Sequence, residues 1–367
     1  MLLFVVVVVF TMQCVFGAFF LLRFHALRNI HANPLNRYPV SVIICAKNEA
    51  EQLSINLPQV LSQVYPDKYD RSYYEVVVIN DGSTDETTAI LNSLKLEYPH
   101  LVVVNIDVGD SKGKKNALAM GLQKAKHYML LMTDADCKPA SNNWLRLMVA
   151  PLHIGKEIVA GYGGYYTKLG VFNAFVRWET MHTYLQYSTY ASIGMPYMAV
   201  GRNMACTRTV LEKAIKDPIW HAIPSGDDDL LVQIAGTATN VAVVSNPDAF
   251  TYSAAKATIA GWIHQKQRHL STGKYYKTST QLLLGGYALS HAGIWILMLC
   301  SVFFVPKLPI IIILIRCVLY WWVWKRVLNR LNEKIPLYLL PLFDLGWMMY
   351  NFAFLPYITW KNKKNWK

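Results

Sequence analysis

The chain has 367 residues, 53% of them hydrophobic, and its mean hydropathy of +0.22 is too high for an ordinary soluble domain. It carries 36 basic and 23 acidic residues, a net charge of +13, and several long stretches contain no charge at all. The six cysteines lie far apart without metal-ligand spacing. These features exclude a disordered chain, a disulfide scaffold and a single uniform globule, and they predict that part of the chain lies in lipid.

Uncharged blocks predict the membrane segments. Residues 1–22 are long enough, at about 1.5 Å per residue, to cross a hydrocarbon core of ~30 Å, and without a basic start we expect them to be kept as a signal anchor. Positive residues follow the block, so the positive-inside rule places the next domain in the cytoplasm of a protein integral to the inner or plasma membrane. Two more blocks, 281–306 and 308–324, predict a hairpin of two spans.

The last apolar block, residues 335–360, is interrupted by prolines and by Asp344. Our first interpretation is a full crossing; the alternative is a re-entrant or interfacial segment, which keeps the basic tail KNKKNWK inside. Arg316 and Asp344 are the full charges within the last two blocks, and an unpaired charge at mid-membrane costs on the order of 3 kcal/mol. We predict that they pair across two helices, unless each reaches the interface or faces the cytoplasmic domain.

Residues 38–255 read as a soluble α/β domain with a mainly parallel sheet. Runs of Val, Ile and Leu without a polar face predict strands covered by helices on both sides. The predicted strands are 40–46, 75–80, 101–106 and 128–133, and the helical windows between them are 49–64, 84–96 and 114–126. A capping box of Ser83 and Glu86 is expected to begin the second of these helices.

The strand ends carry the candidate chemistry, because functional groups gather at the carboxyl ends of parallel strands. The dinucleotide and P-loop glycine motifs are both missing from the sequence. Asp134 and Asp136 end a buried strand, and two close carboxylates there predict a Mg²⁺ or Mn²⁺ site, unless they cap the next helix. Asp81, before Gly82, can accept hydrogen bonds from a base or a ribose, although Asp-Gly-Ser is also a common turn.

Three further groups suit a phosphorylated substrate. Lys112, Lys114 and Lys115 open a helix and can reach phosphate, or form a solvated basic face. The triplet Asp227 to Asp229 opens another helix, where a carboxylate stays ionised and can act as a general base, or serves as an acidic cap. Residues 256–280 form an amphipathic basic segment in which Gln265 and Arg268 share a face and can hold a diphosphate, or the helix merely lies on the membrane.

Together these motifs resemble the membrane-bound family 2 glycosyltransferases, which include ceramide glucosyltransferases and the cellulose, hyaluronan and poly-N-acetylglucosamine synthases. The resemblance covers residues 39–276, in the family's order: PVSVIICAKNE, VVVINDGSTDET, KGKKNAL, MLLMTDADCKP, SGDDDLL and QKQRH. It implies a GT-A fold, a Rossmann-like mixed sheet, and a UDP-sugar donor. It further implies that Asp81 lies near uracil, Lys114 and Asp134 near the nucleotide, and Gln265 and Arg268 at the pyrophosphate.

The same resemblance implies that Asp136 holds the metal and that Asp228 is the base that deprotonates the acceptor hydroxyl. Two departures from the family's pattern concern the acceptor side. His269 stands where the family has an acceptor-stacking Trp, and an imidazole stacks more weakly. The family's Glu-Asp reads Asp227-Asp228-Asp229 here, so that choosing Asp228 depends on its spacing from Gly226.

We therefore predict an inverting, metal-dependent transferase that moves a sugar from a UDP-sugar to a membrane-associated hydroxyl, with a lipid as the favoured acceptor. The alternative is a processive polysaccharide synthase of the poly-N-acetylglucosamine or hyaluronan type. A polyprenyl-phosphate transferase and an inactive scaffold are less favoured. No nucleic-acid partner is expected, because the basic residues lie beside the membrane spans. The aromatic stretch 161–196 is the expected acceptor-side surface, or an interface helix.

Overall fold

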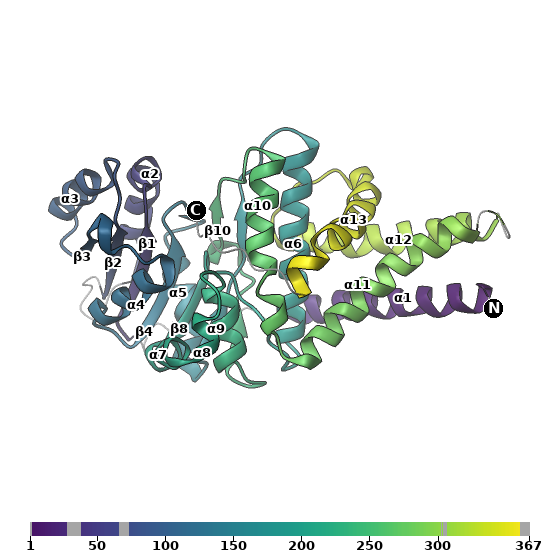
Figure 1. Ribbon diagram of the computed structural model, residues 1–367, viewed down its shortest axis with the longest axis horizontal. Coiled ribbons are helices and arrows are strands. Elements are labelled where there is room, and N and C mark those ends of the chain that lie inside the picture. The colour runs from purple at the N-terminus through teal and green to yellow at the C-terminus, as the bar shows by residue number, and fades with distance from the viewer. Residues whose placement is uncertain (1, 28–37, 66–72, 302, 304–306, 360–367) are drawn as a thin grey trace.

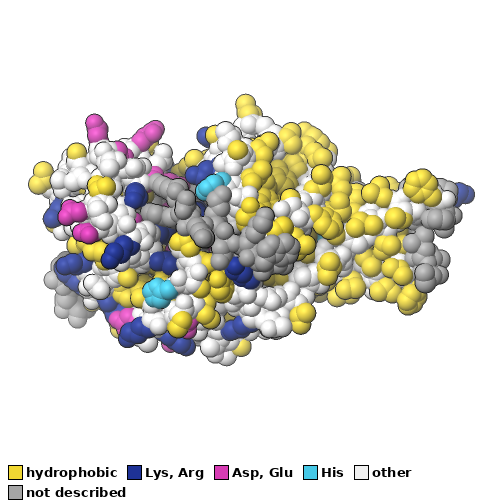
Figure 2. Space-filling view, in the orientation of Figure 1, with side chains coloured by type: hydrophobic (Ala, Val, Ile, Leu, Met, Phe, Trp, Pro, Cys, Tyr) yellow, Lys and Arg dark blue, Asp and Glu magenta, His cyan; other side chains and the backbone are white. Residues whose placement is uncertain are grey.

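The computed structural model describes residues 2–27, 38–65, 73–301, 303 and 307–359 (Figure 1). An α/β domain carries long helices at one end, on the right in Figure 1. Hydrophobic side chains cover these helices, whereas charged side chains gather on the α/β domain (Figure 2). The basic tail KNKKNWK, on which the topology prediction partly depends, lies outside the described residues.

The described part of the chain forms a seven-stranded mixed sheet in the order β3-β2-β1-β4-β8-β6-β9. The first four strands are parallel, β8 runs antiparallel to β4 and β6, and β9 is parallel to β6. The bounds are β1 (Val40–Ala46), β2 (Tyr74–Asp81), β3 (Leu101–Ile106), β4 (Met129–Asp134), β6 (Ile158–Ala160), β8 (Met204–Thr207) and β9 (Val241–Val243). A smaller sheet joins β5 (Lys138–Pro139), β10 (Thr251–Ser253) and β7 (Gly163–Tyr165).

The four predicted strands are confirmed to within one residue at each end. Their apolar runs are explained by cores on both sheet faces: Ile43 belongs to one core, whereas its neighbours Val42 and Ile44 belong to the other. The remaining helices of the domain are α2 (Ala50–Leu61), α3 (Thr87–Glu97), α4 (Lys114–Lys124), α5 (Trp144–Val149), α6 (Val171–Ala191), α7 (Arg208–Lys216), α8 (Pro218–His221), α9 (Asp227–Ala235) and α10 (Ile259–Leu270). Short 3₁₀ turns are η1 (Val108–Asp110), η2 (Ala150–Ile154), η3 (Pro247–Ala249) and η4 (Gly273–Tyr275).

The predicted capping box was wrong. Helix α3 begins at Thr87, with Glu86 itself at the N-cap and no side-chain cap there. The Ser83 hydroxyl instead accepts a hydrogen bond from the backbone N–H of Asn48, at 2.9 Å, and Thr84 N–H donates to Asn48 Oδ1 at 2.8 Å. The two loops after β1 and β2 are thus joined at the sheet edge, a long-range contact that local spacing does not reveal.

Four helices follow or precede the α/β domain: α1 (Leu2–Ala26), α11 (Thr278–Ser301), α12 (Lys307–Arg330) and α13 (Leu340–Thr359), with η5 (Leu337–Leu339) before the last. Helix α1 packs against α11 and α12, and α13 packs against α10 (Figure 1). By length and composition, Phe4–Ala26 and Thr278–Cys300 could each cross a membrane. The helical hairpin predicted from 281–324 is therefore present as α11 and α12, although its place in a bilayer stays a prediction.

The predicted pairing of Arg316 with Asp344 is confirmed. Arg316 Nη2 lies 2.6 Å from Asp344 Oδ2, and Nη1 donates to Gln13 Oε1 at 3.2 Å. Trp295 Nε1 donates to Asp344 Oδ2 at 3.0 Å, and His291 Nε2 lies 2.8 Å from Asp344 Oδ1. Asp344 is only 2% exposed, and its charge is compensated by side chains from two other helices, α11 and α12. Helix α1 contributes indirectly, because Gln13 accepts a hydrogen bond from Arg316.

Loss of either partner should therefore weaken the helical bundle. Arg316→Gln should lower the free energy of unfolding by about 3 kcal/mol, because it leaves a buried carboxylate without its cation. The double variant Arg316→Gln/Asp344→Asn should recover part of that loss, since both charges are gone. Thermal unfolding in detergent measures the coupling. Losses that simply add in the double variant would contradict a direct pair.

Candidate active site

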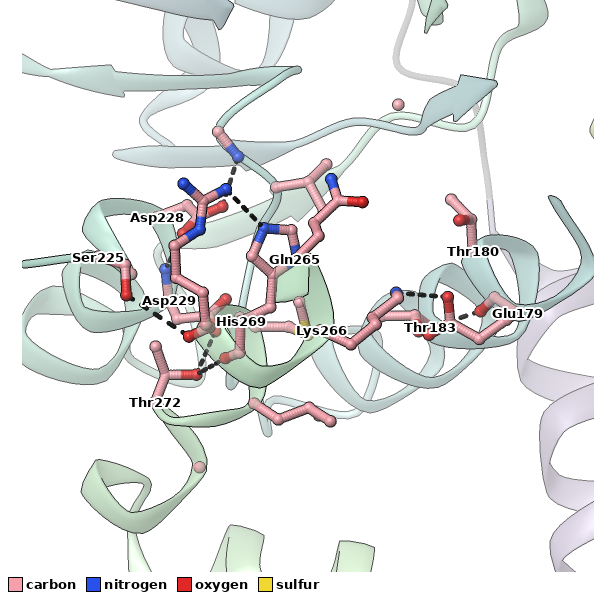
Figure 3. A pocket seen from close by; sticks show the side chains of 18 of the residues that line it. Glu179, Thr180, Thr183, Ser225, Asp228, Asp229, Gln265, Lys266, His269 and Thr272 are labelled. Carbon is pink, nitrogen blue, oxygen red and sulfur yellow. Dashed lines mark hydrogen bonds and ion pairs between the residues drawn. The ribbon is translucent and has the colours of Figure 1, made fainter. Parts of the chain in front are cut away.

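A cavity of about 1140 Å³ opens at the carboxyl ends of β1 and β4 and continues between α6, α10, α11 and α13. Most of the residues singled out in the sequence line it: Lys114, Asp134, Asp136, Asp228, Gln265, Arg268 and His269. Part of this wall is shown in Figure 3. Asp81 is the predicted site residue that does not line it.

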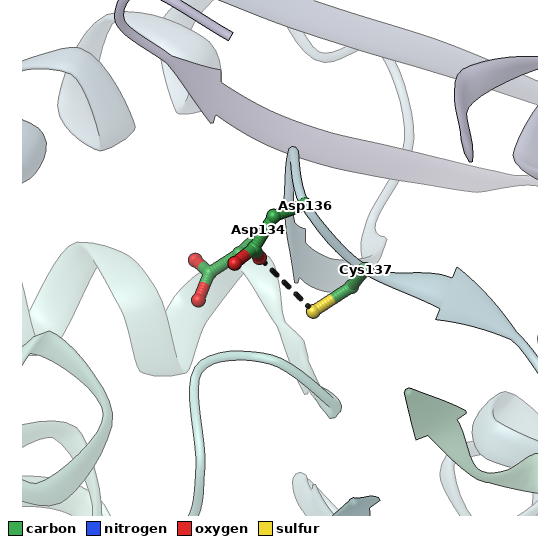
Figure 4. A group of neighbouring side chains, drawn as sticks. All are labelled: Asp134, Asp136 and Cys137. Atoms are coloured by element: carbon green, nitrogen blue, oxygen red, sulfur yellow. Dashed lines mark hydrogen bonds between the residues drawn. The ribbon is translucent and has the colours of Figure 1, made fainter. Parts of the chain in front are cut away.

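Asp134 is the last residue of β4, and Asp136 lies in the turn that follows it (Figure 4). One carboxylate oxygen from each aspartate and the sulfur of Cys137 all lie within 4.8 Å of one another. Burial and the nearby Asp134 charge raise the pKa of Asp136. Although burial opposes it, the Lys114 ammonium, 2.9 Å from Asp134 Oδ1, holds the pKa of Asp134 below its usual range. Asp136 has no basic side chain within hydrogen-bond distance among the residues that the structure describes. Two close carboxylates of this kind fit a hard divalent cation such as Mg²⁺ or Mn²⁺.

The three aspartates at the start of α9 have three different environments. Asp227 Oδ2 lies 3.1 Å from Lys114 Nζ. Asp229 is buried, and its Oδ2 accepts hydrogen bonds from the hydroxyls of Thr272, at 2.7 Å, and Tyr276, at 2.8 Å. Asp228 accepts hydrogen bonds from two backbone N–H groups, Gly201 at 2.6 Å and Asp229 at 3.0 Å. One of the three carboxylates thus neutralises a lysine, one ties α9 to the segment after α10, and Asp228 is held by neutral donors in the cavity wall.

Helix α10 brings its polar residues to the opposite wall. Its first turn is capped by Thr258, whose hydroxyl accepts from Gly261 N–H at 3.1 Å. Gln265 Nε2 donates to the Tyr165 hydroxyl at 3.3 Å, and Gln265 Oε1 is buried with no hydrogen-bond partner among the described residues. Arg268 Nη2 lies 3.3 Å from His269 Nε2, and His269 is exposed at the cavity.

Asp81, at the end of β2, is fully buried. Neither of its carboxylate oxygens has a hydrogen-bond partner in the described part of the chain, an arrangement that costs free energy unless a ligand supplies donors. Gly82 beside it has φ +67°, and a Cβ there would lie 3.0 Å from Val108 Cα, so that η1 packs directly on this turn. Lys47 Nζ donates to Ser111 Oγ at 2.8 Å and so joins the loop after β1 to the residue that follows η1.

Of the lysines that open α4, only Lys114 reaches the carboxylates. The Lys115 ammonium donates to the carbonyl oxygens of Trp220 and Ile223 and lies 5.0 Å from the centre of the Trp220 ring. Burial lowers the pKa of Lys115 to about 8. Lys115 therefore anchors α8. Both predictions for Lys115, a phosphate contact and a solvated basic face, were wrong. Lys112 does not line the cavity.

The segment before β8 also belongs to the site, although no motif in the sequence indicated it. Arg202 lies over the Tyr165 ring, 4.3 Å from its centre, and its carbonyl accepts hydrogen bonds from Thr133 and Thr251. A Cβ on Gly201 would lie 3.2 Å from Lys114 Nζ and 3.4 Å from Asp228 Oδ2. No spacing rule points to this segment, because it enters the site through the antiparallel pairing of β8 with β4.

Gly201→Ala should therefore disturb Asp228 without unfolding the protein. The added methyl group presses on the groups that converge there, and we expect kcat to fall about tenfold, as a small displacement of a reacting group does. Initial rates at saturating donor measure the effect. The matched control is Gly286→Ala on α11, where an added Cβ meets nothing within 4 Å. Equal rates for both variants would show that Asp228 tolerates the contact.

The pH dependence of turnover should report the charges around Asp228. Burial and the Asp227 charge raise the pKa of Asp228, and Lys114 acts against them. Because a base works only when ionised, kcat/KM should fall as the pH falls through that raised pKa. Asp227→Asn removes a like charge and should move this acidic limb to lower pH. Lys114→Met should move this limb to higher pH. Shifts in the opposite directions would mean that Asp228 is not the general base.

The sequence was compared with known protein families and relatives. Residues 41–213 match the family described as Glycosyl transferase family 2. Glycosyltransferase AglE of Haloferax volcanii is 34% identical over 123 residues, 33% of this chain and 38% of the relative. Beta-monoglucosyldiacylglycerol synthase of Synechocystis sp. is 39% identical over 100 residues, 27% of this chain and 20% of the relative. The matched region thus spans well under half the length of either relative.

Among solved structures, the mannosyltransferase PcManGT from Pyrobaculum calidifontis, in complex with GDP-Man and Mn²⁺, superposes with a TM-score of 0.59. The superposition covers 96% of this chain and 99% of that one at 17% identity, and so concerns the fold alone. Residues 41–213 form a family 2 glycosyltransferase domain, and the fold is of the GT-A type, as the motifs predicted.

Proposed function

We propose that the protein transfers a sugar, with inversion, from a nucleoside-diphosphate sugar to the hydroxyl of a membrane lipid. One observation carries this proposal: a single cavity runs from Asp134, Asp136 and Asp228 to the apolar walls of α11 and α13. A water-soluble acceptor needs no such continuation. The named relative that makes a glucosyldiacylglycerol is in keeping with a lipid acceptor.

The donor fits the polar end of the cavity. Asp136, together with Asp134, would hold Mg²⁺ or Mn²⁺, which supplies charge that offsets the departing diphosphate when bound. Lys114, Gln265 and Arg268 supply donors for the nucleotide and its phosphates, and the unsatisfied oxygens of Asp81 suit the N–H groups of a base. UDP is the nucleotide that the motifs imply; GDP is the one in the PcManGT complex, so both are tested.

The acceptor side provides the base. Asp228 takes the proton of the acceptor hydroxyl as that oxygen attacks the anomeric carbon, and the bond from this carbon to the diphosphate oxygen breaks on the opposite face of the sugar. The raised pKa of Asp228 makes its carboxylate a stronger base than an ordinary aspartate. His269 at the cavity surface is proposed to contact the acceptor.

The packing of α13 supports an interfacial position rather than a full crossing. Just before α13, Glu333 pairs with the buried Arg177 of α6. Near its far end, Ile358 lies against Gly273 of η4, where an added Cβ would be 3.3 Å away. Both ends therefore contact the α/β domain, so that α13 would start and finish on the same face of the bilayer. The basic tail would then stay with the catalytic domain in the cytoplasm, as the positive-inside rule requires.

The test is a transfer assay on the full-length protein in detergent with Mn²⁺ and a native lipid extract. Radiolabelled UDP-sugars and GDP-mannose are supplied one at a time, and products are partitioned between organic and aqueous phases. We expect label in the organic phase with one donor. Label in a high-molecular-weight aqueous product would establish a polysaccharide synthase instead, and the Asp228→Asn variant serves as the blank.

A further inference from the structure

A second charged group lies in the cavity wall, apart from the carboxylates assigned above. Glu179 of α6 forms an ion pair with Lys266 of α10, and the two side chains are only 4% and 12% exposed. Figure 3 shows the pair on one side of the view and Asp228 with His269 on the other. Because desolvation offsets the attraction, a buried ion pair contributes little to stability compared with apolar residues of similar volume. Its position in the wall therefore points to a ligand.

The pair and its neighbours offer both donors and acceptors. Glu179 Oε1 accepts from the Thr183 hydroxyl at 3.3 Å, whereas Oε2 faces Lys266 and accepts no other hydrogen bond from the described residues. The Thr180 hydroxyl donates to the Val176 carbonyl, and the single Thr183 proton is shared between the Glu179 carbonyl and Oε1. The lone pairs of both hydroxyls are left able to accept. A ligand group with several hydroxyls, each able to donate and to accept, matches this wall.

The charges favour an uncharged ligand group. Glu179 and Lys266 cancel one another, and an anionic phosphate placed here would meet the Glu179 carboxylate. The cations Arg202 and Arg268 act instead on Asp134, at the polar end of the cavity, where the donor diphosphate is proposed to lie. Lys256 and Lys274 also line the cavity, but the Glu179 carboxylate beside Lys266 makes this part of the wall less favourable for a phosphate than the polar end, where Arg202 and Arg268 act.

Beyond the pair the cavity becomes apolar. On α11 it is lined by the small residues Gly285, Ala288 and Ala292, which share one helix face, and on α13 by Tyr350 and Leu355. One cavity wall therefore combines a carboxylate, a buried ion pair with hydroxyl groups beside it, and apolar surface from α11 and α13. This combination suits a lipid with a polar but uncharged headgroup.

We propose that Glu179 and Lys266 bind the neutral, hydroxyl-bearing headgroup of the acceptor lipid, a glycerol or a sugar, and so select it over a polyprenyl phosphate. The inference rests on the proposed function and names its acceptor class. One headgroup hydroxyl is presented to Asp228 while the others are held by the pair, and the hydrocarbon chains follow the channel between α11 and α13.

The experiment compares acceptors and variants in mixed micelles. Diacylglycerol, monohexosyl-diacylglycerol and undecaprenyl phosphate are offered separately with the donor found in the transfer assay. Glu179→Gln should raise the acceptor KM about tenfold, the loss expected of a hydrogen bond to a charged group, with the donor KM unchanged. Glu179→Gln/Lys266→Gln, which leaves no unpaired charge, should do the same. The matched control is Glu212→Gln, an exposed, ion-paired glutamate on α7.

The outcomes separate the two proposals. Labelled neutral lipid together with the raised acceptor KM supports the headgroup site. Labelled neutral lipid with an unchanged acceptor KM in both variants leaves the proposed function standing and overturns the headgroup site. Labelling of undecaprenyl phosphate alone overturns the headgroup site and also the hydroxyl acceptor of the proposed function. No labelled lipid at all, while nucleotide binding with Mn²⁺ persists, overturns the lipid acceptor and the headgroup site together. If Glu179→Gln unfolds, its melting temperature will show this. The acceptor KM of the double variant Glu179→Gln/Lys266→Gln then decides whether the headgroup site is correct.

Discussion

Asp228→Asn is expected to lower kcat by roughly 10³-fold, the range that a general base contributes. The asparagine keeps the volume, but its single amide oxygen can accept only one of the two backbone hydrogen bonds that Gly201 donates to Oδ2 and Asp229 to Oδ1. The melting temperature is therefore measured beside the rate. What is lost is the capacity to take a proton. Transfer rates at saturating donor and acceptor measure the change, and nucleotide binding, followed separately by calorimetry, should stay within a few-fold of the wild type.

The neighbouring aspartates provide matched controls for this variant. Asp229→Asn removes a buried carboxylate bonded to Thr272 and Tyr276, and should lower the melting temperature more than it lowers kcat. Asp227→Asn frees Lys114 from one partner and should change the pH profile while turnover persists. If either control lost as much activity as Asp228→Asn at unchanged stability, the base would be assigned to the wrong carboxylate.

The sheet could be predicted from the sequence because its strands are buried on both faces. A run such as 40–46 has no polar residue that a wet face would require except Ser41, which is itself buried and bonded to Glu75. The polar ends of the parallel strands then placed Asp134 and Lys114 at one edge of the sheet. Asp228 joins them from α9, which follows no parallel strand, and its place was implied by the family resemblance alone. The family was recognisable because these motifs occur in the chain in the family's order.

What the sequence could not provide depends on contacts between distant segments. Arg202 reaches the site through an antiparallel strand of four residues, too short for a periodic signal. Glu179 and Lys266 are ordinary charges on two helices until the packing of α6 against α10 buries them together. The role of Lys115 was misjudged because α8, which it contacts, is a helix of four residues that no local pattern announced.

Asp136→Asn should abolish the dependence of nucleotide binding on Mn²⁺. Removing one of two close carboxylates leaves the cation with Asp134, which already shares its charge with Lys114. We expect the Kd of the nucleotide in the presence of Mn²⁺ to rise by about 100-fold, the upper range for losses in the support of a metal site. Calorimetric titration of UDP and of GDP, each with Mn²⁺ and with EDTA, measures this without any need for the acceptor.

The control for Asp136→Asn is Cys137→Ser. The Cys137 thiol donates to Asp136 Oδ1 at 3.5 Å, and burial, followed by the charges of Asp136 and Asp134, raises its pKa well above the usual range. As a neutral thiol it is a poor ligand for Mn²⁺, and a serine hydroxyl can replace its hydrogen bond, so that the Kd should change little. A loss in Cys137→Ser equal to that in Asp136→Asn would mean that the thiol is needed at the metal site, and that a softer metal than Mn²⁺ should be tested there.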